Sequence, residues 1–103
     1  MRLGRRRFSD LVERQLDLFA AEETELLDEA AQADAAWGSA DREDSEELYG
    51  DYQLVVDAVG ERLADIRDHY ASALGESTAG EYRQTFNRAA TKRFGRFASA
   101  LVE

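Results

Sequence analysis

The chain has one histidine, His69, which follows Asp65 by four residues in a segment that also contains Glu61 and Asp68. Residues four apart lie on the same face of a helix, so Asp65 and His69 could hold a hard or borderline divalent metal ion. That face points away from the apolar residues of the segment, and the sequence lacks the Glu-x-x-His pairs of di-iron helical bundles. We therefore expect a surface hydrogen bond here, with a metal site at Asp65 and His69 as the alternative.

Glu23 is the one charged residue in an otherwise apolar series. The series steps alternately by four and three residues through Val12, Leu16, Phe19, Glu23, Leu26, Ala30, Ala33 and Trp37. A carboxylate at such a position must be paired, solvated or neutral, because an unpaired buried charge is very costly. Counting along antiparallel helices from a turn near residue 41 places Glu23 opposite residues 59–62. We expect an ion pair with Arg62, or with Arg88 or Lys92. The alternatives are a surface completed by another chain, and catalytic or metal-binding use.

Motifs for catalysis are absent from the sequence. Glu22, Glu23 and Glu25 spread over more than a third of a helix circumference, so their carboxylates cannot converge on one ion unaided. The chain has no cysteine, which excludes disulfides and thiolate chemistry. Glycine-rich phosphate loops and nucleophile elbows are also missing. We therefore predict no catalytic residue and no cofactor, and favour a protein that is not an enzyme.

Three long helices would position these residues. The alternation of four and three predicts a first helix over about 9–37, and apolar arcs predict a second over about 45–74 and a third over about 79–101. No proline interrupts them. Because the connections are short, consecutive helices should run antiparallel. The sequence therefore predicts an all-α, up-down-up three-helix bundle with parallel first and third helices. It forms a single domain over 1–103, with a short basic tail at about 1–8.

Two glycines lie inside the second predicted helix, where glycine costs about 1 kcal/mol relative to alanine. Gly60 borders the apolar arc, so the close approach of a neighbouring helix could offset this cost. Gly50 faces outward, and the sequence offers no account of it.

Charge is distributed unevenly along the chain. The net charge is −9, and residues 15–61 hold fifteen acids and a single base, Arg42. Such a surface argues against nucleic acid and anionic membranes as partners, because it would repel both. The stretch from Lys92 to Phe97 mixes bases with aromatic residues, as RNA-binding segments do, but Phe94 and Phe97 fall on the predicted core face. We expect the bases of the third helix to pair with acids of the same molecule, such as Asp28, Asp34, Glu46 and Glu47.

Neither a membrane span nor an export signal is predicted. No stretch approaches the roughly 20 apolar residues that a span needs. The arginine-rich start is not followed by the apolar run of a signal peptide. We expect a cytoplasmic protein.

The leading functional hypothesis is a non-enzymatic module for protein–protein interaction or self-association, including a homodimer. Leu11 and Leu18 lie seven residues apart and outside the apolar series that contains Glu23, and they form a second apolar strip beside Glu22 and Glu23. One alternative is a carboxylate-rich bundle that binds a metal or small ligand at Glu23 or at Asp65 and His69. Another is an acidic adaptor that binds a basic protein.

Overall fold

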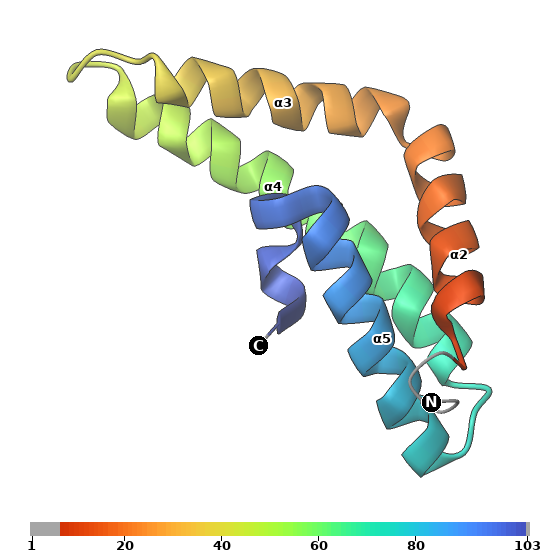
Figure 1. The fold of residues 1–103 in the computed structure, drawn as a ribbon. Coiled ribbons are helices and arrows are strands. Elements are labelled where there is room, and N and C mark those ends of the chain that lie inside the picture. The colour runs from red at the N-terminus through yellow and green to blue at the C-terminus, as the bar shows by residue number, and fades with distance from the viewer. Residues whose placement is uncertain (1–6, 103) are drawn as a thin grey trace.

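The computed structural model describes residues 7–102, and every regular element in that part of the chain is a helix (Figure 1). The α-helices are α2 (Ser9–Glu22), α3 (Thr24–Gly38), α4 (Ser45–Ala71) and α5 (Glu76–Phe94), and a 3-10 helix, η1 (Gly95–Val102), follows them. The predicted all-α class is therefore confirmed. The structure departs from the predicted three-helix bundle in its first helix and in its third.

The first predicted helix, 9–37, is two helices that meet in a bend at Glu23 (Figure 1). Glu23 has φ −111° and ψ 37°, outside the α-helical region. The hydroxyl of Thr24 donates to the carbonyl oxygens of Ala20 at 3.4 Å and Ala21 at 3.2 Å. Side-chain bonds of this kind compete with the backbone ladder and bend helices. Glu23, the charged residue that interrupts the apolar series, is therefore also the residue at which the helix breaks.

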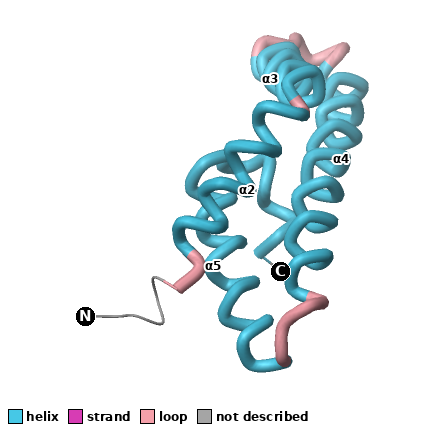
Figure 2. The backbone as a smooth tube through the Cα atoms, turned by 90° about the vertical axis from the view of Figure 1, so that its right-hand side faces the viewer, coloured by secondary structure: helices cyan, strands magenta, loops and turns pink. Residues whose placement is uncertain are grey.

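The bend gives the two halves different neighbours. Beyond Glu23, α3 runs antiparallel along the N-terminal half of α4, and the two helices extend together past the rest of the molecule (Figure 1). Figure 2 shows α3 nearly end-on, above α2. At their far end the rings of Trp37 and Tyr49 pack with centroids 4.7 Å apart. Their extension makes the protein elongated, with a radius of gyration of 15.6 Å against roughly 13 Å for a compact domain of this length.

Before the bend, α2 packs mainly on α5. Phe8 meets Tyr82 edge to face, and Phe19 meets Phe94 in the same way, each pair at 5.4 Å between ring centroids. Because both pairs advance in the same direction along the chain, α2 and α5 run parallel, as predicted for the first and third helices. Phe8 is buried in the core although the sequence placed it in the basic tail. Of that tail, residues 1–6 lie outside the described residues.

The third predicted helix, 79–101, begins earlier, at Glu76, and ends at Phe94. Gly95 has φ 59° and ψ −131°, a conformation that only glycine adopts without strain, and the chain continues from it as η1. This turn carries η1 onto α4, where a Cβ placed at Gly60 would lie 3.4 Å from Ala100 Cβ. The neighbour at Gly60 is therefore the side chain of Ala100 on η1, at van der Waals distance, and not the closely approaching backbone of a helix.

The core is wholly apolar in the described part of the chain, apart from the hydroxyl groups of two tyrosines. Its side chains recur at three- and four-residue spacing on α2, α4 and α5, the pattern that lets helices pack along one face. The fully buried large side chains are Leu16, Val12, Phe19, Val59, Leu63, Tyr82 and Phe86. The burial of these side chains holds α2, α4 and α5 together.

Candidate functional site

An open groove lies between α2 and α4. Both helices pack on α5, and before the bend at Glu23 a space of about 730 Å³ remains between α2 and α4. Four residues from each helix line it: Gln15, Leu18, Phe19 and Glu22 from α2, and Asp65, Ile66, His69 and Tyr70 from α4. The groove brings together Leu18 and Glu22, predicted as interaction residues, with Asp65 and His69, predicted as a possible metal site.

The floor of the groove is apolar. Phe19 is buried, while Ile66 and Tyr70 are partly buried against the core. Leu18 stands over them with 57% of its surface exposed. Burying a leucine of this kind is worth about 1.5–3 kcal/mol, so a partner that covers Leu18 gains part of that free energy.

The rim of the groove is polar and acidic. Glu22 on α2 and Asp65 on α4 are both exposed and line the groove from its two sides. Gln15 and His69 continue the two sides farther from the bend. The rim therefore carries two carboxylates at the end near Glu23 and an amide and an imidazole at the other end.

An ion pair closes the end of the groove near the bend. Arg62 donates to Glu23 Oε2 at 2.7 Å, which is the pair expected from counting along antiparallel helices. The side chains are 25% exposed for Glu23 and 57% exposed for Arg62, so the pair is worth at most about 1 kcal/mol. Its role is to tie the junction of α2 and α3 to α4.

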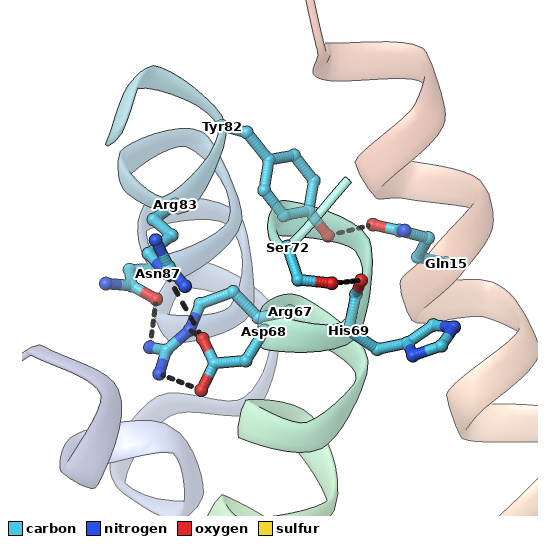
Figure 3. Close-up of polar contacts among 8 residues, drawn as sticks. All are labelled: Gln15, Arg67, Asp68, His69, Ser72, Tyr82, Arg83 and Asn87. Carbon is cyan, nitrogen blue, oxygen red and sulfur yellow. Dashed lines mark hydrogen bonds and ion pairs between the residues drawn. The ribbon is translucent and has the colours of Figure 1, made fainter. Parts of the chain in front are cut away.

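A hydrogen bond fixes the opposite end (Figure 3). The hydroxyl of Tyr82 on α5 donates to Gln15 Oε1 at 2.8 Å. Burial raises the pKa of this hydroxyl above its ordinary value of 10.0, and the bond to Gln15 opposes the rise only in part. Tyr82 thus links α5 to the α2 side of the groove from inside the core.

The acidic residues next to His69 do not act together. Asp68 is directed towards α5 (Figure 3). Its neighbour Arg67 donates to it through two nitrogens, at 2.8 and 3.2 Å, and Arg83 of α5 donates to it at 3.2 Å. The hydrogen bond from Arg67 lowers the pKa of the Asp68 carboxyl below 3.8, and Arg83 lowers it further. Arg67 also donates to Asn87 at 3.0 Å. This cluster ties α4 to α5 and leaves Asp68 unavailable to the groove.

Surface hydrogen bonds in this segment are made by Asp68, and no hydrogen bond joins the side chains of Asp65 and His69 within residues 7–102. In Figure 3 the imidazole of His69 points away from Arg67 and Asp68, on the side of α4 that faces α2. Its ring makes no hydrogen bond within residues 7–102, and its backbone oxygen accepts one from Ser72 Oγ at 2.8 Å. In the same range no three histidine, aspartate or glutamate side chains come together as a metal site would need.

The predicted apolar strip of Leu11 and Leu18 is only partly exposed. Leu11 is half-buried and packs against the core, whereas Leu18 projects into the groove. Ile66 and Tyr70, on the opposite wall, belong to the apolar arc of the helix predicted over 45–74 and were not predicted as site residues. Their spacing from Asp65 and His69 on one helix was the available signal.

Several bases of α5 and η1 bind acids of the same molecule, as expected. Arg93 binds Asp17 at 2.7 Å and Arg96 binds Asp34 at 3.1 Å. Asp34 was among the expected partners, while Asp17 on α2 was not. Phe94 and Phe97 are partly buried against the core, so the basic and aromatic stretch is largely used inside the molecule.

No α-helix in the described chain is both long and apolar enough to cross a membrane. Comparison of the chain with protein-family models, with curated proteins and with solved structures gives no match.

Proposed function

We propose that this protein is a non-enzymatic protein–protein interaction module, and that it binds a helical segment of another protein in the groove between α2 and α4. The observation that carries the proposal is Leu18, exposed over an apolar floor between two helices. An amphipathic helix that lays its apolar face into such a groove is a recurrent mode of recognition.

The dimensions of the groove suit a helix. Its α2 wall runs from Gln15 to Glu22, which corresponds to about 10 Å, or two helical turns, at the rise of an α-helix. The groove is open to solvent along one side, whereas small-molecule sites enclose most of their ligand. A bound helix would sit beside α2 and α4 as the fourth member of a bundle whose other side α5 already covers.

Charge favours another protein over a second copy as the occupant. A second copy docked on this groove would bring its own acidic surface near Glu22 and Asp65. The chain also carries a net charge of −9, which adds to the repulsion between copies. We therefore expect the isolated protein to be monomeric in sedimentation, and its groove to be free for a different chain.

Selection from a library of displayed helical peptides tests the proposal. Peptides enriched on the wild-type protein are then measured against Leu18→Glu and against Leu54→Glu. Leu54 is the matched control, because it is an α4 leucine that is 70% exposed and does not line the groove. We expect binding to be lost with Leu18→Glu and kept with Leu54→Glu. Peptides that bind both variants as they bind the wild type would contradict the proposal, and circular dichroism checks that both variants fold.

A further inference from the structure

We infer that the helix which this groove accepts is cationic, with an apolar ridge flanked by lysine or arginine at one end. The inference rests on the proposed function and names the chemistry of the partner. It follows from which carboxylates of the structure are already neutralised and which are not.

The two carboxylates on the rim are free while their neighbours are paired. Among the ion pairs of residues 7–102, Glu23 binds Arg62 and Asp68 binds Arg67 and Arg83, but none involves Glu22 or Asp65. Each free carboxylate lies within three residues of a paired one on the same segment. The rim therefore presents two uncompensated negative charges on opposite sides of an apolar floor.

The arginines of α4 cannot supply the missing charge while they hold their present partners. Arg62 is engaged at the bend by Glu23, and Arg67 is directed towards α5 by its bonds to Asp68 and Asn87. Glu61, one turn before Asp65 on α4, is exposed and adds to the negative potential. A partner with bases on both sides of its apolar ridge would neutralise Glu22 and Asp65 together.

The polarity of the rim also predicts the layout of the bound helix. Both free carboxylates lie at the bend, next to the Glu23–Arg62 pair, whereas Gln15 and His69 occupy the opposite end. The bases of the partner should therefore gather at one end of its apolar ridge. That ridge needs apolar residues three or four apart, so that they fit around Leu18 and over Ile66 and Tyr70.

The test uses three synthetic amphipathic helices that share one apolar ridge and carry lysine, glutamine or glutamate at the flanking positions of one end. Binding to the monomeric protein is measured by titration at about 0.1 M and about 1 M salt, where the Debye length falls from roughly 10 Å to roughly 3 Å. We expect the lysine peptide to bind roughly ten-fold tighter than the glutamine peptide at low salt, and the glutamate peptide to bind weakest. The preference for lysine should shrink at high salt.

A matched pair of double variants locates the effect. Glu22→Gln with Asp65→Asn removes the rim carboxylates, and Glu43→Gln with Asp51→Asn makes the same change of charge at exposed positions outside the groove. We expect the first double variant to lose most of the preference for lysine and the second to keep it. Equal losses in both would overturn the inference, because the preference would then come from net charge alone.

The remaining outcomes separate the inference from the proposed function. If all three peptides bind equally and Leu18→Glu abolishes their binding, the groove is a docking site but its partner is not selected by charge. If none binds, or if the lysine peptide binds Leu18→Glu as well as the wild type, the groove is not the docking site and both proposals fail.

Discussion

Two glycines of this protein should respond to alanine in opposite directions. Gly50 lies inside α4, and a Cβ added there would meet no atom within 4 Å. Alanine should therefore gain the helix propensity that glycine lacks, about 1 kcal/mol. Gly95 also has no atom within 4 Å of a built Cβ, but its φ of 59° and ψ of −131° suit only glycine. Alanine at this position should cost about 1–3 kcal/mol through backbone strain alone.

The expected difference between Gly50→Ala and Gly95→Ala is therefore about 2–4 kcal/mol in the free energy of unfolding. A change of 1 kcal/mol shifts Tm by roughly 4–8 °C in a domain of about this size, so Gly50→Ala should melt higher and Gly95→Ala lower by at least that amount. Thermal and urea unfolding can be followed by circular dichroism and by Trp37, the only tryptophan. A neutral Gly95→Ala, or a destabilised Gly50→Ala, would refute the reasoning from backbone geometry.

Three further predictions concern the groups that hold the ends of the groove and the α4–α5 contact. Glu23→Gln should lower the free energy of unfolding by at most about 1 kcal/mol. A double-mutant cycle with Arg62→Gln should give a coupling free energy between the two side chains that decreases as salt is added. A coupling of zero at low salt would contradict the pairing. Because the folded pKa of Asp68 is lowered, its pairing contributes stability above about pH 4 and is lost as pH falls through the folded pKa. Asp68→Asn should therefore reduce the acid sensitivity seen in urea titrations at several pH values, and an unchanged pH profile would count against the pairing. Burial raises the pKa of the Tyr82 hydroxyl, so the unfolded chain loses the phenolic proton at a lower pH than the folded protein does. The stability should therefore fall above about pH 10, and it should fall less steeply in Tyr82→Phe. An equal fall in both proteins would refute this assignment.

The sequence was informative about helix position and about local pairing. The helix over 45–74 was found close to its observed bounds, Ser45–Ala71. The pairing of Glu23 with Arg62 followed from counting along antiparallel helices and is confirmed. Both predictions depend on periodicity and on short connections, which are local properties of the chain.

The bend at Glu23 could not be predicted, because the apolar series continues in phase across it. Leu26 follows Glu23 by three residues, as in an unbroken helix, so the period carries no sign of a break. The bend coincides with a change of packing partner, because α3 packs on α4 while α2 packs mainly on α5. The end of α5 at Gly95 was not predicted either. Gly50 and Gly60 lie inside α4, so a glycine in the sequence does not by itself show that a helix ends there.

Residues of the candidate site were predicted separately, as members of two different sites. Leu18 and Glu22 were identified as interaction residues, and Asp65 and His69 as weak metal ligands, without any sign that they share one groove. Their proximity depends on how far α2 stands from α4, and the bend sets that separation. Spacing along single helices identified the residues, but only the packing of the helices brought them together.

The most direct test of the central claim is a map of backbone amide chemical shifts during titration with the lysine-flanked helical peptide. The groove between α2 and α4 predicts that the largest shifts fall on residues 15–22 and 65–70, with little change around Leu54 on the outer face of α4. Shifts centred on Leu54 or on the outer face of α5, with residues 15–22 unmoved, would contradict it.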